Sequence, residues 1–205
     1  RFRTFAAMKI SASIYSDSRN DLSQTIKSLD AHQVDLFHVD CNDDLSVFDD
    51  IIALREISNI PVDLHIITPT PSKYYQRLRE VPVEYVTFQL EPLEEPLIWP
   101  SDLTAAKGVA ITTPTAVDAF DAHSSCDFIL IMATVPGQSG GVFDKENFKK
   151  IRTFRKRYPN KSIHVDGGVN GEVSFILRNM GVSTAVSGSY LFKGPSIGHA
   201  LMNLT

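Results

Sequence analysis

Short apolar runs rich in β-branched residues alternate along the chain with segments whose apolar residues recur at helical spacing. The predicted strands are residues 9–14, 34–41, 62–67, 83–88, 108–112, 127–133, 162–166 and 184–187. The predicted helices are residues 21–31, 46–57, 72–80, 116–123, 145–158, 172–180 and 196–204. Strands that alternate with helices in this way are typical of parallel βαβ units.

Eight strand-helix units in one chain of 205 residues predict a closed (β/α)8 TIM barrel. An open doubly wound sheet is the alternative. Polar residues recur at the ends of several predicted strands, which favours the barrel, because an open sheet would concentrate them at one switch point. Residues 91–101 contain three prolines and are predicted to form an irregular connection.

The predicted domain organisation is a single barrel over residues 9–205. Residues 1–8 are interpreted as a tag remnant or the tail of an upstream domain, and the sequence leaves both open. The net charge of −4 gives no electrostatic footprint for nucleic acid. The apolar stretch around residues 128–133 is far shorter than the roughly 18 to 20 residues of a membrane span. Cys41 and Cys126 lie in apolar runs, which predicts buried thiols and a reducing, cytoplasmic compartment.

Ionisable side chains gather at the ends of three predicted strands. The period of two places His38 and Asp40 on one strand face, and His65 and Asp166 end two other strands. Taken singly, each histidine is equally consistent with a hydrogen-bonded core residue, and each aspartate with a cap on the following turn. Together they predict a site for one divalent ion, with Zn, Fe(II), Mn and Co as candidates. His164 shares the parity of Asp166 one layer deeper, and is interpreted as a core residue or as support for a ligand.

Glycine-rich turns follow the last three predicted strands. Their candidate phosphate-binding residues are Gly137, Gln138, Ser139, Gly140, Gly141, Gly167, Gly168, Gly188 and Ser189. Singly, such turns are ordinary. At the late strands of a barrel, however, they predict backbone N–H groups that hold a phosphate, and therefore a phosphorylated substrate.

From Lys9 to about Asn203, the sequence resembles the ribulose-phosphate 3-epimerase family. The motifs that carry the resemblance are 9–14 with Ser13, His38-Val39-Asp40, 63–65, Met132 with Pro136-Gly137, 165–169 and 186–189. The resemblance implies that His38, Asp40, His65 and Asp166 bind one metal ion. It also implies that Asp40 and Asp166 are the acid-base pair.

The resemblance further implies a phosphorylated sugar as the small-molecule partner, with Ser13, His65 and Met132 added to the glycine-rich residues as substrate contacts. The default reaction is conversion of D-ribulose 5-phosphate to D-xylulose 5-phosphate through an enediolate. We also expect a homo-oligomer.

Three departures from the family pattern surround the expected pocket. Asn42 and Ile67 stand where methionines are expected, so that Met132 remains of three, and residues 138–142 replace an aromatic-glycine-glycine-glutamine pattern. These changes keep two alternatives open. One is an epimerase of another ketose phosphate, such as a ketohexose phosphate or a surface-polysaccharide precursor, and the other is a noncatalytic sugar-phosphate binding domain.

Overall fold

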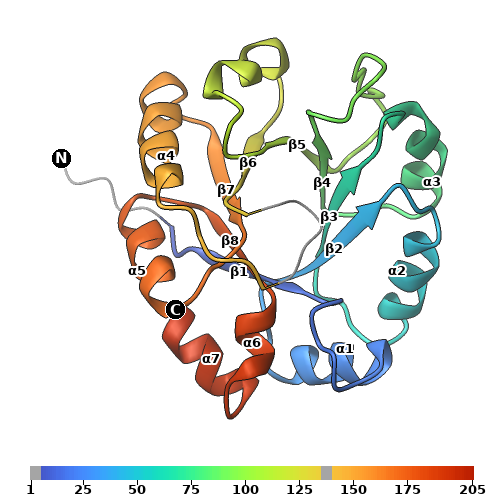
Figure 1. The fold of residues 1–205 in the computed structure, drawn as a ribbon. Coiled ribbons are helices and arrows are strands. Elements are labelled where there is room, and N and C mark those ends of the chain that lie inside the picture. The colour runs from blue at the N-terminus through green and yellow to red at the C-terminus, as the bar shows by residue number, and fades with distance from the viewer. Residues whose placement is uncertain (1–5, 135–139) are drawn as a thin grey trace.

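The computed structural model describes residues 6–134 and 140–205, and its centre is a closed barrel of parallel strands (Figure 1). The strands follow sequence order around the barrel, and β1 pairs with β8 to close it. They are β1 (Lys9–Ser13), β2 (Leu36–Asn42), β3 (Val62–Ile67), β4 (Tyr85–Gln89), β5 (Ala106–Ile111), β6 (Phe128–Met132), β7 (Ser162–Asp166) and β8 (Thr184–Ser187). The predicted TIM barrel is confirmed, and the open sheet is wrong.

Helices surround the barrel on its outside (Figure 1). The α-helices are α1 (Leu22–Ala31), α2 (Val47–Arg55), α3 (Tyr75–Glu80), α4 (Glu146–Arg157), α5 (Gly171–Asn179), α6 (Ser189–Lys193) and α7 (Ile197–Leu204). Side-chain caps begin several of them. Asp21 and Gln24 form a reciprocal capping box on α1, and Asn170 and Ser196 accept from backbone N–H groups at the starts of α5 and α7.

The helical layer differs from the prediction in three places. Residues 116–123 form a 3-10 helix, η2 (Val117–His123), and the third predicted helix begins as a 3-10 turn, η1 (Pro71–Tyr74). The short helix α6 was not predicted, because five residues are too few to show a helical period. The connection between β4 and β5 contains no helix, as its prolines indicated.

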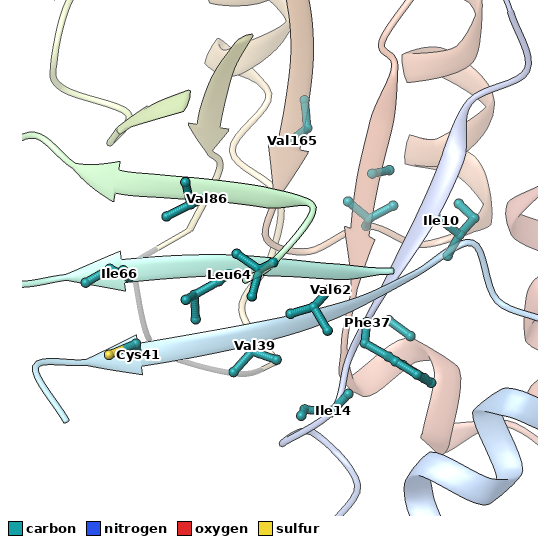
Figure 2. Close-up of a cluster of buried hydrophobic side chains, with 14 of the residues drawn as sticks. Ile10, Ile14, Phe37, Val39, Cys41, Val62, Leu64, Ile66, Val86 and Val165 are labelled. Atoms are coloured by element: carbon teal, nitrogen blue, oxygen red, sulfur yellow. The ribbon is translucent and has the colours of Figure 1, made fainter. Parts of the chain in front are cut away.

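The main hydrophobic core lies between the strands and the surrounding helices. In β2, Phe37, Val39 and Cys41 have the same parity and are fully buried, and Ile10 of β1 and Leu64 of β3 join them (Figure 2). The alternate residues of each strand point into the barrel. Polar residues at those alternate positions therefore reach the barrel interior, and the last of each strand reaches the C-terminal mouth.

Both cysteines are buried, as predicted, and neither forms a disulfide. Within residues 6–134 and 140–205, no helix has the length and hydropathy needed to cross a bilayer.

Candidate metal centre and active site

Four side chains from three strands converge at the C-terminal mouth of the barrel. His38 and Asp40 come from β2, His65 from β3 and Asp166 from β7. One potential ligand atom of each lies within 4.8 Å of those of the other three. The convergence predicted from strand parity is therefore present.

The separations inside this cluster fit a single small ion. His38 Nε2 lies 3.1 Å from Asp40 Oδ1 and 3.5 Å from Asp166 Oδ2, and His65 Nδ1 lies 3.3 Å from Asp40 Oδ1. Ligands held about 2.1 Å from a tetrahedral ion would lie roughly 3.4 Å apart. Two imidazoles and two carboxylates are also a donor set that borderline divalent ions accept. The residues present therefore fit the metal that the sequence predicts.

His38 is oriented by a second carboxylate. Asp63 is almost fully buried on β3, and its Oδ2 lies 2.8 Å from His38 Nδ1 while accepting a hydrogen bond from the Ser11 hydroxyl. A hydrogen on Nδ1 leaves the lone pair of Nε2 facing the cluster. Sequence reasoning gave Asp63 no role, although its inward parity, two residues before His65, could have indicated one.

His65 is oriented by a buried amide instead. Its Nε2 lies 2.8 Å from Oε1 of Gln89, the last residue of β4, while its Nδ1 faces Asp40. Sequence reasoning missed Gln89. A neutral amide at a strand end carries no distinctive signal, and its proximity to His65 depends on the register of β3 against β4.

The two aspartates of the cluster have different electrostatic environments. Burial alone would raise the pKa of Asp40, but the neighbouring His38 and His65 outweigh it and hold that pKa well below its usual range. Burial raises the pKa of Asp166 to about 6, and the negative charge of Asp40 adds to this rise while His38 opposes it. One mouth therefore holds two carboxyl groups with different proton affinities, a pattern typical of acid-base sites.

Asp40 and Asp166 face a cavity of about 640 Å³ at the C-terminal mouth. Most of the predicted substrate contacts in the described residues line it, namely Ser13, Met132, Gly140, Gly141, Gly167, Gly168, Gly188 and Ser189. His65 is fully buried and is not among the described lining residues. Gly137, Gln138 and Ser139 lie outside the described residues. The cavity volume suits a small sugar phosphate.

Two glycines of this cavity leave little room for a Cβ. Gly168 has a φ of +66°, and a Cβ there would lie 2.2 Å from the backbone nitrogen of Phe143. A Cβ on Gly188 would lie 2.6 Å from Ser16 Oγ, beside Ser13. The backbone therefore borders the cavity without side chains at these positions, as a backbone phosphate site needs.

Other cavity residues were not predicted as substrate contacts. Tyr15, Lys145 and Lys193 line the cavity, and the hydroxyl of Tyr15 donates to Asp50. Asn42 also lines it, so this departure from the family pattern borders the expected substrate, whereas Ile67 is not among the described lining residues. His164 lies outside the four-residue cluster and stacks on Phe128.

The chain is similar to known proteins over most of its length. The family model described as "Ribulose-phosphate 3 epimerase family" matches residues 9–192. A cytoplasmic isoform of ribulose-phosphate 3-epimerase from Oryza sativa subsp. japonica is 26% identical over 97% of this chain and 93% of its own length. A ribulose-phosphate 3-epimerase from Methanocaldococcus jannaschii is 28% identical over 96% of this chain and 89% of its own length.

Among solved structures, phosphoribosyl anthranilate isomerase from Thermus thermophilus superposes with a TM-score of 0.69 at 13% identity, covering 96% of each chain. At that identity the likeness supports the barrel fold alone. The match over residues 9–192 goes further, because it identifies a family of enzymes over most of the chain. The chain belongs to the ribulose-phosphate 3 epimerase family and is an isomerase of the epimerase class.

Proposed function

We propose that this enzyme inverts the carbon next to the carbonyl of a phosphorylated ketose, and that it interconverts D-ribulose 5-phosphate and D-xylulose 5-phosphate. The observation that carries the proposal is the pair of aspartates beside the two-histidine cluster, both lining one cavity. Similarity to proteins named ribulose-phosphate 3-epimerase supports the choice of substrate.

Inversion needs one group to remove a proton from carbon and another to return a proton from the other face. Asp40 and Asp166 come from β2 and β7, which are separated in the barrel by β1 and β8, so they approach the cavity from different strands. We assign them as base and acid, with their roles exchanged in the reverse reaction. Burial raises the pKa of Asp166 to about 6 before any metal ion is bound, which makes this carboxyl a stronger base than an exposed aspartate.

His38, Asp40, His65 and Asp166 would hold the divalent ion. When bound, it would supply positive charge that stabilises the oxyanion developing on the substrate. Asp63 and Gln89 hold the two histidine rings in place for this task. Burial of both rings excludes water from their side of the cluster.

The phosphate end of the substrate is assigned to the glycine-lined part of the cavity, with Gly140, Gly168, Gly188 and Ser189 as contacts. These residues border the same cavity as the two aspartates. Backbone N–H groups at such turns bind phosphate without a cationic side chain.

Incubation of the metal-loaded protein with D-ribulose 5-phosphate in D2O tests the proposal. We expect D-xylulose 5-phosphate that carries deuterium at the inverted carbon, detected by NMR. A parallel incubation with ketohexose phosphates tests the alternative substrate that Asn42 at the cavity favours. Turnover of a ketohexose phosphate with no turnover of the pentulose would overturn the substrate assignment and retain the epimerase chemistry.

The proposal also includes the setting of the enzyme. Two buried, unpaired cysteines support a reducing, cytoplasmic compartment. A net charge of −4 supports a small-molecule partner rather than nucleic acid. The expected homo-oligomer stays a prediction that sedimentation of the purified protein can test.

A further inference from the structure

Gln89 connects the metal cluster to a carboxylate that lies outside it. Gln89 is 2% exposed, and its two amide atoms face in different directions. Its Oε1 lies 2.8 Å from His65 Nε2, and its Nε2 lies 2.6 Å from Glu91 Oε2. An amide has a donor end and an acceptor end. The contact with His65 alone therefore does not fix which ring nitrogen carries the hydrogen.

Glu91 settles the orientation of that amide, because every described group that hydrogen-bonds its side chain is a donor. Its Oε1 accepts from the backbone N–H of Thr112 at 2.6 Å and from the hydroxyls of Thr112 and Thr115 at 2.9 and 2.8 Å. Burial alone would raise the pKa of Glu91, but these donors and Gln89 outweigh it and hold the pKa below its usual value. An ionised carboxylate only accepts hydrogen bonds.

The direction of each hydrogen bond then follows in sequence. Glu91 can only accept, so Gln89 must donate to it through Nε2 and turn Oε1 toward His65. An amide oxygen can only accept, so His65 must carry its hydrogen on Nε2. With its hydrogen on Nε2, His65 can bind a metal ion through Nδ1, which lies 3.3 Å from Asp40 Oδ1 in the cluster.

We propose that Glu91, acting through Gln89, fixes His65 in the tautomer whose Nδ1 can bind the metal ion. Gln89 and Glu91 are thus positioning residues for a metal centre that itself rests on the proposed function. The tautomer of His38 is set by a single direct contact instead, between its Nδ1 and Asp63. For His65, the donors on Glu91 lie at and beyond the end of β5, so the loop after β5 contributes to the metal centre.

The hydrogen-bonded chain from Glu91 through Gln89 to His65 is called the relay below. Two substitutions interrupt it at different points. Gln89→Leu removes the acceptor for His65 Nε2–H. Glu91→Gln changes little in volume but introduces an NH2 group among donors, so that Gln89 can turn its amide over. Gln76→Leu is the matched control, because Gln76 donates to Glu80 at 2.8 Å on the exposed face of α3, away from the cluster.

Metal affinity is the first measurement, made by titrating metal-free protein with Zn²⁺ against a chromophoric chelator. We expect Gln89→Leu and Glu91→Gln to weaken Zn²⁺ binding by about 10- to 100-fold, the usual effect of losing a group that orients a ligand. Gln76→Leu should bind Zn²⁺ as the wild type does. Circular dichroism and thermal unfolding of each metal-free variant establish the folded fraction, to which the affinity is referred.

The tautomer of His65 is the second measurement, made by ¹⁵N NMR of the imidazole in metal-free protein. We expect a hydrogen on Nε2 in the wild type and in Gln76→Leu, whether or not Nδ1 also donates to Asp40, and a partial loss of the Nε2 hydrogen in the two relay variants. A purely structural role would lower the unfolding temperature while leaving the tautomer and the affinity of the folded protein unchanged. That result in either folded variant would overturn the proposal.

The two measurements also separate this proposal from the proposed function. A wild-type protein that binds no Zn²⁺ would contradict the metal centre, while the NMR experiment would still show whether Glu91 controls the tautomer of His65. A wild-type protein that binds Zn²⁺ but epimerises no ketose phosphate would contradict the function, while the Zn²⁺ affinities and His65 tautomers of the variants would still decide the relay.

Discussion

The two ends of the barrel interior hold the same residue types in different surroundings. At the C-terminal mouth, both nitrogens of His38 face carboxylates, Asp63 on one side and the cluster on the other. Toward the N-terminal end, His164 stacks on Phe128 with ring centroids 4.0 Å apart, and the described residues offer its ring no hydrogen bond. Burial lowers the pKa of His164 to about 4, so this ring is uncharged at neutral pH.

The comparison shows that inward parity alone does not make a histidine a ligand. His38 and His164 both point into the barrel, but only His38 has an acceptor that fixes its tautomer and acidic neighbours at its free nitrogen. The C-terminal mouth gathers charge, whereas the N-terminal end is packed mainly with aromatic rings. Substitutions at the mouth should therefore alter chemistry, and those at the other end should alter packing.

Among substitutions at the C-terminal mouth, Asp166→Asn is expected to have the largest effect on activity. The amide is nearly isosteric, but it weakens a proposed ligand and removes a proton carrier, so epimerisation should slow by at least roughly 10²- to 10⁴-fold. The metal-free variant should unfold at or above the wild-type temperature, because the substitution removes a buried negative charge beside Asp40. Steady-state kinetics and thermal unfolding in a chelator measure the two effects.

Asp118→Asn is the control for this experiment, because Asp118 is exposed at the start of η2 and should tolerate the change in both assays. Exchange of the substrate α-proton with solvent, without inversion, would assign Asp40 to the other face. Near wild-type epimerisation by metal-bound Asp166→Asn would instead contradict the mechanism with two aspartates.

Gly188→Val should give a smaller effect at the same mouth. The new Cβ would meet Ser16 Oγ at 2.6 Å, so the valine would displace Ser16 and crowd the cavity that both residues line. We expect KM for D-ribulose 5-phosphate to rise about tenfold, equivalent to about 1.4 kcal/mol, with a much smaller change in kcat.

Gly194→Val supplies the matched control for Gly188→Val, because a Cβ at Gly194 meets nothing within 4 Å. Its kinetics should match the wild type. An unchanged KM in folded Gly188→Val would contradict the assignment of Gly188 to the phosphate site.

The sequence predicted the barrel and the four-residue cluster because both follow from local periodicity. Alternation of apolar and polar residues in β2 is enough to place His38 and Asp40 on one inward face. The helical layer was harder to predict, since α6 and η2 are too short or irregular for a period to emerge.

The residues that orient the ligands could not be found in this way. The contact between Gln89 and His65 depends on how β4 is offset against β3, and that register comes from closure of the whole barrel. Asp63 was more accessible to sequence reasoning, because it lies two residues before His65 on the same inward face. Parity identifies inward residues, but the partner of each inward residue requires the three-dimensional register.

His164→Leu is the smallest expected effect and the sharpest test of the comparison. The change replaces the imidazole with an apolar side chain of similar size and loses the stack on Phe128, so the free energy of unfolding should fall by about 1 kcal/mol. Zn²⁺ affinity and kcat/KM should stay within about twofold of the wild type, since burial already keeps His164 uncharged. His65→Leu, measured alongside, should lose Zn²⁺ binding by far more than any relay variant. If His164→Leu weakened Zn²⁺ binding to a similar extent, the two ends of the barrel would form one functional unit. The division between charge at the mouth and packing at the base would then be wrong.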